Sequence, residues 1–242
     1  MPSGETASFQ CTAAMFDHLA ERWDCEHGPA SARAAAFEAH IDYLKTHCAR
    51  VDQPRVLDIG CATGQHLVRL HPWIGEGIGI DLSPRMIERA AANARACGLE
   101  TLQFVEMSAE ELTPKYFGTF DLVLFIGVLE HMPSPAAVLR GARRILRSEG
   151  RIVIIMPHWL NPTHWMNRRA DRVPARHLSL RALCAIAAEE GLRLDQAAAL
   201  PHGSDLLRPF GTYGKRLFAG RLAGAGAFLR GAFGASLKHE RR

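Results

Sequence analysis

The sequence predicts an α/β fold in which a mostly parallel sheet lies between two layers of helices. One observation is the buried-strand pattern of residues 56–59, which leads into a loop of small residues and then into a helix. A second is that further apolar stretches at 77–80, 102–105 and 120–126 alternate with helical patterns. This alternation is typical of parallel strands that are joined by helices.

The loop at residues 60–64 carries the strongest functional signal. Gly60, Ala62 and Gly64 keep it free of bulky side chains, so that a ligand can approach the backbone. Asp81 follows the second strand, 21 residues after Gly60, where nucleotide-binding βαβ units carry the carboxylate that accepts from ribose hydroxyls. A dinucleotide fingerprint needs a third glycine at the start of the helix, and this glycine is missing. The spacing therefore favours a ligand with adenosine but no pyrophosphate over NAD.

The stretches Val-Leu-Asp-Ile-Gly-Cys-Ala-Thr-Gly (56–64) and Gly-Ile-Asp-Leu-Ser (79–83) resemble the first two motifs of class I S-adenosylmethionine-dependent methyltransferases of the small-molecule, ubiquinone-biosynthesis type. The resemblance implies a Rossmann-like, doubly wound sheet of seven strands with an N-terminal helical cap, a lid insertion and S-adenosyl-L-methionine as cofactor. The residues at matching positions that we expect to contact the cofactor are Asp58, Gly60, Cys61, Ala62, Gly64, His66, Asp81, Leu82, Met86, Ser108, Ala109, Glu110, Ile126 and Gly127.

Two helices are expected before the first strand, at about residues 12–24 and 32–48, because apolar residues recur there at helical spacing. In similar methyltransferases such helices cap the cofactor and shape the acceptor pocket, which would place Phe16 and Trp23 against the substrate. The alternative is that both aromatic side chains simply pack on the sheet.

Residues 107–112 resemble the family's third cofactor contact. The resemblance places Leu82, Ser108 and Ala109 beside the adenine ring, and the Glu110 side chain or the Ala109 backbone N–H at its polar edge. The alternative for Glu110 is a solvated helix start.

The apolar run 120–126 predicts a central strand, and residues 127–133 after it resemble the family's fourth motif. There the strand end faces the methionine part of the cofactor, and the following residues face the acceptor. His131 is the first candidate for a general base, because an imidazole titrates near neutral pH; Glu130 beside it is an expected substrate contact. The alternative is that both residues only cap a helix or hold the loop.

A metal site is not expected at this motif. Ubiquinone-type O-methyltransferases carry Glu-x-x-Glu-His here and use it to hold a divalent metal ion. In this chain Gly127 replaces the first glutamate, so one oxygen ligand is missing. Hard cations need several oxygen ligands, and we therefore predict no metal.

A fifth strand at 151–156 leads into residues 157–178, an irregular segment that forms a variable lid in similar methyltransferases. Ligands bind at the carboxyl ends of the strands in open α/β sheets, and tryptophan suits a flat acceptor. We expect a helix after the lid, and then a sixth strand at 192–200. The acceptor-side residues expected in the lid are His158, the second candidate for the base, Trp159, Trp165 and His177.

Three parts are expected along the chain: the helical cap at 1–50, the cofactor-binding domain at 51–204, and a basic tail rich in Gly and Ala at 205–242. The tail holds eight Lys or Arg and two acidic residues, which leaves the body slightly negative. A body without a basic stripe disfavours a nucleic-acid substrate. The usual antiparallel seventh strand is not evident in the tail, which we expect to pack on the domain or a second subunit, or to be disordered, rather than to lie on a membrane surface.

The six cysteines stand at least 13 residues apart, so neither a C-x-x-C chelate nor a compact disulfide framework is indicated. No secretory leader pattern and no apolar run long enough to span a membrane is found. These features predict a cytoplasmic protein. The expected assembly is a monomer or a homodimer.

The function expected from the resemblance is methyl transfer from S-adenosylmethionine to an oxygen or nitrogen of a small molecule, in quinone or secondary-metabolite biosynthesis. The alternatives are a non-catalytic S-adenosylmethionine-binding partner subunit and a C-methyltransferase.

Overall fold

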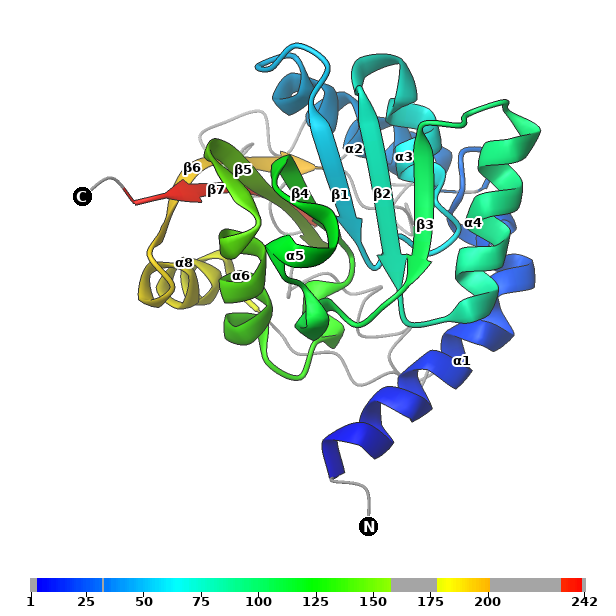
Figure 1. Cartoon of the computed structure of the whole chain (residues 1–242), viewed down its shortest axis with the longest axis horizontal. Helices are drawn as coiled ribbons and strands as arrows, with labels where there is room; N and C mark the ends of the chain where they lie inside the picture. Colours follow the sequence, from blue (N-terminus) through cyan, green and yellow to red (C-terminus); the bar gives the residue numbers. More distant parts are fainter. Residues whose placement is uncertain (1–3, 32, 158–177, 201–231, 241–242) are drawn as a thin grey trace, which may run out of the picture.

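A seven-stranded sheet with helices on both faces forms the body of the protein in a computed structural model that describes residues 4–31, 33–157, 178–200 and 232–240. The strand order is β3-β2-β1-β4-β5-β7-β6 (Figure 1). All neighbours pair in parallel except β7, which is antiparallel to both β5 and β6. The strands are β1 (Arg55–Ile59), β2 (Glu76–Asp81), β3 (Leu102–Glu106), β4 (Phe120–Ile126), β5 (Leu146–Pro157), β6 (Leu192–Leu200) and β7 (Ala232–His239).

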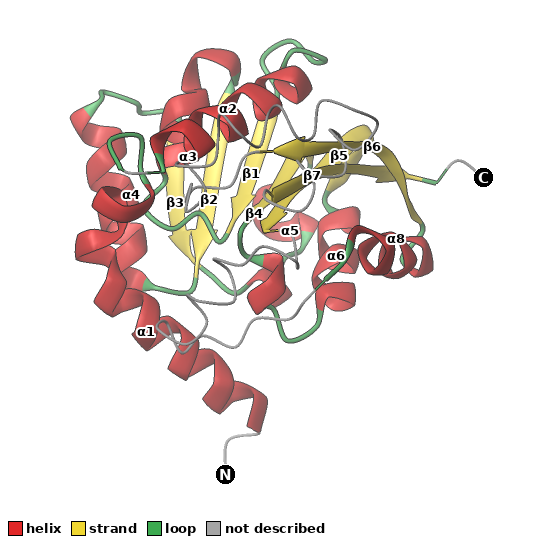
Figure 2. Ribbon diagram, turned by 180° about the vertical axis from the view of Figure 1, so that it is seen from behind, coloured by secondary structure: helices red, strands yellow, loops and turns green. Residues whose placement is uncertain are grey.

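Helices cover the sheet from both sides, as the two opposite views show (Figures 1 and 2). The helices are α1 (Gly4–His27), α2 (Ala34–Cys48), α3 (Gln65–Leu70), α4 (Pro84–Ala96), α5 (Pro114–Phe117), α6 (Pro135–Arg144) and α8 (Leu180–Glu189). Three short turns of 3-10 helix complete the described elements: η1 (His71–Trp73), η2 (Ala109–Glu111) and η3 (Leu129–His131).

Two apolar cores result because successive strand residues face opposite sides of the sheet. Val56 of β1 belongs to the core under α2 and α3, whereas its neighbour Leu57 belongs to the core under α6 and α8. The central strand β4 is buried on both sides, as its continuous apolar sequence predicts. The predicted fold class is therefore confirmed.

The structure corrects one expectation, because part of the supposed tail is the seventh strand. Phe233 and Leu237 of β7 are buried in the core under α6 and α8, and the opposite face carries Gly234, Ser236 and Lys238. A Cβ atom at Gly234 would stand 2.5 Å from the Tyr43 ring of α2, so this position has no room for a side chain, and the face lacks the large apolar residues that mark a strand in the sequence.

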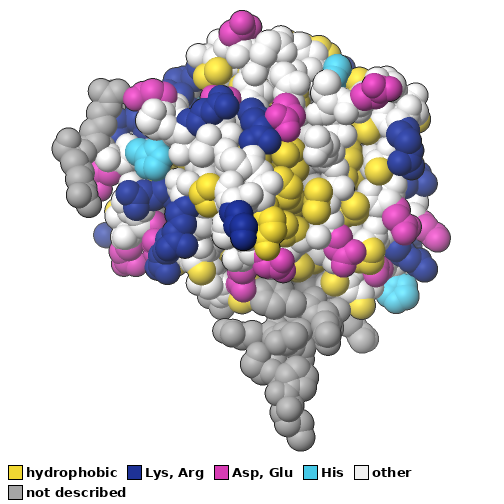
Figure 3. All heavy atoms as spheres, viewed as in Figure 1, with side chains coloured by type: hydrophobic (Ala, Val, Ile, Leu, Met, Phe, Trp, Pro, Cys, Tyr) yellow, Lys and Arg dark blue, Asp and Glu magenta, His cyan; other side chains and the backbone are white. Residues whose placement is uncertain are grey.

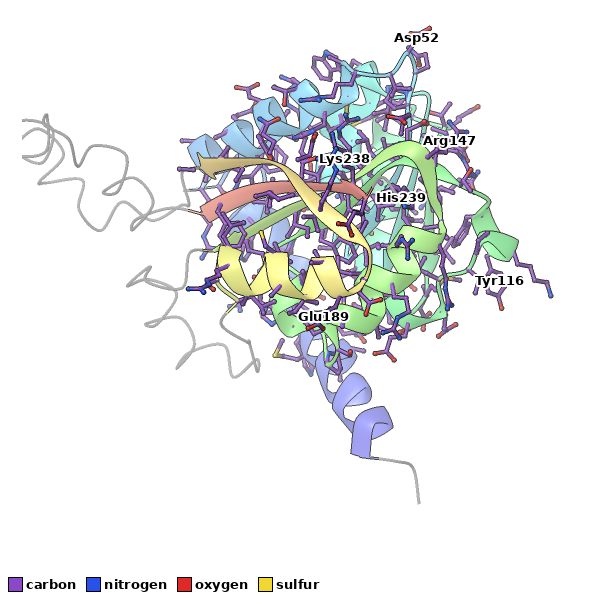
Figure 4. The ribbon with its side chains drawn as sticks, turned by 90° about the vertical axis from the view of Figure 1, so that its left-hand side faces the viewer. Asp52, Tyr116, Arg147, Glu189, Lys238 and His239 are labelled. Carbon is purple, nitrogen blue, oxygen red and sulfur yellow. The ribbon has the colours of Figure 1, made fainter. Side chains whose placement is uncertain are left out.

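Polar side chains also tie β7 into the sheet. Lys238, seen on β7 in Figure 4, pairs with Asp195 of β6, and the Asp195 carboxylate accepts from Arg151 Nε of β5 at 3.2 Å. The pKa of Asp195 is lowered by Lys238 first and by Arg151 second. A single carboxylate thus links three neighbouring strands.

Helix α1 lies beyond the carboxyl ends of β1, β2 and β3, towards which their arrowheads point in both views (Figures 1 and 2). This edge is where open α/β sheets bind ligands. On the face drawn in Figure 3, cationic and anionic side chains of the described residues are interspersed rather than gathered into a basic stripe.

Candidate functional site

The loop at residues 60–64, called here the glycine loop, leaves β1 at the ligand-binding edge. Its conformation needs glycine twice: Gly60 has φ +70 and Gly64 has φ +73. A Cβ atom at Gly60 would stand 2.3 Å from Cγ2 of Val128, and one at Gly64 would stand 2.6 Å from Cε1 of Phe104. The glycine loop therefore packs closely against the segment after β4 and against β3.

The glycine loop is attached to the end of β2. The Gly60 N–H donates to the Ile80 carbonyl at 2.8 Å, and the Ala62 N–H donates to Asp81 Oδ2 at 3.0 Å. The second oxygen of Asp81 accepts from the Ser83 N–H at 2.9 Å. Burial raises the pKa of Asp81, and these N–H groups oppose that rise. Asp81 thus lies next to the glycine loop, as its spacing in the sequence predicts.

Asp58 is an ionisable group in the buried part of β1. It is 1% exposed, and neither carboxylate oxygen has a hydrogen-bond partner among the described residues. Burial, and secondly the nearby Asp81, raise the pKa of Asp58 to about 8. A buried carboxyl group without a partner is costly, and a ligand that brings a cation or a donor would relieve that cost.

The segments after β3 and β4 complete this edge. Ser108 begins η2 by accepting from the Glu110 N–H at 3.2 Å, and the Ala109 side chain is buried in the core. Gly127, at φ +64, is exposed at the end of β4, and its N–H donates to the Ile155 carbonyl at 2.8 Å.

Aromatic rings of α1 lie beside η3, the turn that follows β4. The Phe16 ring lies edge-on to His131 at 6.1 Å between ring centroids and edge-on to Trp23 at 5.9 Å. We call Phe16, Trp23 and His131 the aromatic wall. Glu130, which precedes His131 in η3, is 4% exposed, and burial raises the pKa of its carboxyl group. The structure thus brings together two segments more than a hundred residues apart that the sequence placed near the acceptor.

Some expected site residues lie elsewhere or outside the described part. The His66 ring packs against α2, 5.0 Å from the Phe37 ring and 6.2 Å from the His40 ring. The Met86 side chain is fully buried. Their contact with a cofactor stays a prediction, as does that of the other expected contacts. The acceptor-side residues that fall outside the described residues are His158, Trp159, Trp165 and His177.

Two aspartates of α1 were not singled out from the sequence. Asp17 Oδ1 accepts from the Ser83 hydroxyl, and Asp24 Oδ1 accepts from the Thr63 hydroxyl, each at 2.5 Å. The available signal was a repeat: an aromatic residue followed by aspartate occurs at 16–17 and again at 23–24, two helical turns later.

Within the described ranges, no group of three or more His, Cys, Asp or Glu side chains is arranged to hold a metal ion. No described helix is long and apolar enough to cross a membrane.

The fold and the edge geometry define a Rossmann-like protein with a site for an adenosine-containing ligand. Comparison with known proteins narrows this class. Residues 51–189 match the family model of a methyltransferase domain. The ubiquinone biosynthesis O-methyltransferase of Xanthomonas oryzae pv. oryzae is 33% identical over 147 residues, which are 57% of this chain and 57% of that protein. The match thus spans little more than half the length of this curated relative.

Solved structures share the fold at low sequence identity. The [4+2]-cyclase SpnF superposes with a TM-score of 0.71 at 17% identity, over 97% of each chain. The geranyl diphosphate C-methyltransferase of Streptomyces coelicolor A3(2) superposes with a TM-score of 0.63 at 17% identity, over 84% of this chain and 79% of that one. By its family match, its motifs and its fold, the chain belongs to the class I S-adenosylmethionine-dependent methyltransferases.

S-adenosylmethionine, the cofactor of this family, fits the residues present. It carries an ammonium group and ribose hydroxyls, and Asp58 and Asp81 are carboxylates at the edge where these groups would lie. The oxygens of Asp58, which lack partners among the described residues, would supply the acceptors that an ammonium group needs. The glycine loop lets the ligand approach the backbone.

Proposed function

We propose that this chain transfers a methyl group from S-adenosylmethionine to a hydroxyl oxygen of a small, flat acceptor of the quinol or catechol type. The observation that carries the proposal is the position of His131, which lies in η3, the turn that follows β4, with its ring 6.1 Å from the Phe16 ring between centroids. A group that can accept a proton next to an aromatic surface suits a hydroxyl on a ring. The name of the Xanthomonas relative, a ubiquinone biosynthesis O-methyltransferase, supports an oxygen acceptor.

The roles of the chain's own residues follow from their chemistry. When bound, the cofactor supplies a methyl group attached to a cationic sulfur, and this sulfur is the leaving group, which becomes a neutral thioether. Asp58 and Asp81 hold the ammonium group and the ribose, and the aromatic wall orients the acceptor ring. His131 takes the hydroxyl proton while the acceptor oxygen forms its bond to the methyl carbon, and the electron pair of the broken carbon–sulfur bond stays on sulfur.

Alignment of the reacting atoms and removal of the acceptor's proton contribute separately to the rate. Holding the oxygen, the methyl carbon and the sulfur in line contributes several kcal/mol, on the order of what positioned reactants gain. A base adds about a hundredfold or more when the acceptor is a hydroxyl that is not yet ionised. An amine acceptor attacks before it loses a proton and so needs His131 less.

The test is a screen of purified full chain with methyl-labelled S-adenosylmethionine against quinols, catechols and heteroaromatic amines. Mass spectrometry should find the label on a hydroxyl oxygen of a quinol or catechol. The matched control is the same ring with its hydroxyls replaced by hydrogen, which should remain unlabelled. Label on nitrogen or on a ring carbon would overturn the oxygen acceptor. Turnover with any acceptor would exclude the alternative of a non-catalytic binding subunit.

A further inference from the structure

Helix α1 carries two pairs of an aromatic residue and an aspartate, Phe16-Asp17 and Trp23-Asp24. Seven residues are close to two full helical turns, so the two pairs repeat on the same side of the helix. The aromatic members contact each other and belong to the aromatic wall. The aspartates reach in a different direction, towards the segments after β1 and β2.

Asp24 makes the more specific of these contacts, because it reaches into the glycine loop. Its Oδ1 accepts from the Thr63 hydroxyl at 2.5 Å, and its Oδ2 accepts from Asn93 Nδ2 of α4 at 3.2 Å. The same Asn93 nitrogen donates to the Thr63 carbonyl at 2.9 Å. Arg89 Nε lies 3.4 Å from Asp24 Oδ2. Thr63, which is fully buried, is therefore held by both its hydroxyl and its carbonyl.

Thr63 lies in the part of the glycine loop where the backbone conformation is least favourable. Its neighbours Ala62 and Gly64 both have positive φ, at +47 and +73. A non-glycine residue at positive φ is strained, and such a conformation persists only when surrounding contacts fix it. Asp81 fixes the loop from the β2 side through the Ala62 N–H. Asp24 and Asn93 fix it from the opposite neighbours, α1 and α4.

We propose that Asp24 is a positioning residue for the glycine loop: it holds Thr63 in the conformation that receives S-adenosylmethionine, and it thereby couples the docking of α1 to cofactor binding. The inference rests on the proposed function in one respect, that the glycine loop receives this cofactor. Asp17 supports the coupling, because it accepts from the Ser83 hydroxyl at 2.5 Å and from the Arg85 N–H at 3.3 Å.

The coupling has a consequence for the acceptor. Phe16 lies next to Asp17 in α1 and contacts His131. A helix that docks more firmly when the cofactor is bound would therefore complete the aromatic wall only after the cofactor is in place. Acceptor binding would follow cofactor binding, because the first ligand shifts the population of α1 towards its docked position.

The first experiment is a double-mutant cycle on S-adenosylhomocysteine affinity, measured by calorimetry on the full chain. Asp24→Ala and Thr63→Val should each weaken binding about five- to thirtyfold, and the double variant should bind no more weakly than the weaker single variant. Thr63→Ser keeps the hydroxyl that Thr63→Val removes, and its affinity should be close to that of the wild type. Glu21→Ala, a carboxylate removed from the exposed side of the same helix, is the matched control and should bind like the wild type.

The second experiment separates coupling from a merely structural role of α1. The Arg22 side chain is 68% exposed and lies between the two aspartates. Trypsin cleaves only where the backbone unfolds, so cleavage after Arg22 reports local unfolding of α1, which its docked position opposes. S-adenosylhomocysteine should slow this cleavage at least about tenfold in the wild type and in Glu21→Ala, and should not slow it in Asp24→Ala at saturating ligand.

The outcomes distinguish this inference from the proposed function. If the wild type does not bind S-adenosylhomocysteine, the proposed function fails. If the wild type binds and the Asp24→Ala and Thr63→Val losses multiply in the double variant, Asp24 does not act through Thr63. Retained protection at Arg22 in Asp24→Ala would also overturn the coupling.

Discussion

The two sides of the ligand-binding edge are built in different ways. The proposed cofactor side consists of the glycine loop, Asp58 and Asp81, which lie within a stretch of 24 residues and are positioned by backbone hydrogen bonds. The proposed acceptor side consists of the aromatic wall, in which Phe16 and Trp23 come from α1 and His131 comes from η3, the turn after β4. The cofactor side thus depends mainly on local backbone geometry, to which α1 adds the contact of Asp24 with Thr63, whereas the acceptor side depends on the docking of a distant helix.

The two sides should therefore tolerate different substitutions. Backbone geometry at positive φ accepts few residue types, so the cofactor side should respond sharply to small substitutions. Side chains on a docked helix can be exchanged without altering the fold, so the acceptor side is free to fit different substrates.

Gly60→Ala should produce the largest effect. The residue has φ +70, and the new Cβ would stand 2.3 Å from Val128 Cγ2. Backbone strain and overlap together should lower S-adenosylhomocysteine affinity more than about a hundredfold, measured by calorimetry.

Gly98→Ala is the matched control, because Gly98 has a similar φ of +68 but nothing within 4 Å of the new Cβ. It should lower the free energy of unfolding by about 1 kcal/mol and leave affinity unchanged. Adding Val128→Ala to Gly60→Ala should recover part of the binding. Equal affinities of Gly60→Ala and Gly98→Ala would mean that the close approach of the glycine loop to Val128 is not required.

His131→Ala tests the acceptor side. It should lower kcat about a hundredfold with little change in cofactor affinity, and the loss should shrink for acceptors that are already ionised at the assay pH. The measurement is a pair of pH–rate profiles, wild type and variant, with phenols of graded pKa. The same acidic limb in both profiles would remove His131 from the role of base and transfer that role to His158.

Asp81→Ala should show the opposite pattern. Loss of a charged acceptor for the ribose hydroxyls should weaken S-adenosylhomocysteine binding by about 1–3 kcal/mol, whereas kcat at saturating cofactor should stay close to that of the wild type. Asp42→Ala, an exposed carboxylate on α2, is the control. Unchanged affinity in a folded Asp81→Ala variant would show that Asp81 does not hold the ribose.

The same contrast explains how far the sequence could predict the structure. The three strands between Arg55 and Glu106 were predicted to within one residue at each end, because apolar runs and glycines at a loop are local signals. β7 was missed, because Tyr43 leaves no room for a side chain at Gly234 and the strand alternates small residues with only two large apolar ones, so that the sequence resembles a glycine- and alanine-rich tail.

The candidate site was predictable to the same degree. Asp81 and the glycine loop follow from spacing alone, whereas the bonds of Asp17 and Asp24 depend on where α1 docks. No pattern within α1 states which loop its aspartates will reach. Only the repeat of aromatic and acidic residues marks the helix as different from an ordinary amphipathic one.

The smallest expected effect concerns the proton on Asp58. Its pKa of about 8 in the unliganded protein means that the carboxyl group is mostly protonated at pH 7. Since the pKa of Asp58 is raised from 3.8 to about 8, the folded protein keeps a proton that the unfolded chain loses. The free energy of unfolding therefore falls as the pH rises between these two values. An ammonium group beside Asp58 favours the carboxylate and lowers its pKa again. Binding of S-adenosylhomocysteine at pH 7 should therefore release most of one proton.

Calorimetry in phosphate and in Tris, whose ionisation enthalpies differ, should give different apparent enthalpies for the wild type and equal ones for Asp58→Asn. Equal enthalpies in both buffers for the wild type would show that the ammonium group does not meet Asp58. The cofactor side would then depend on the glycine loop and Asp81 alone.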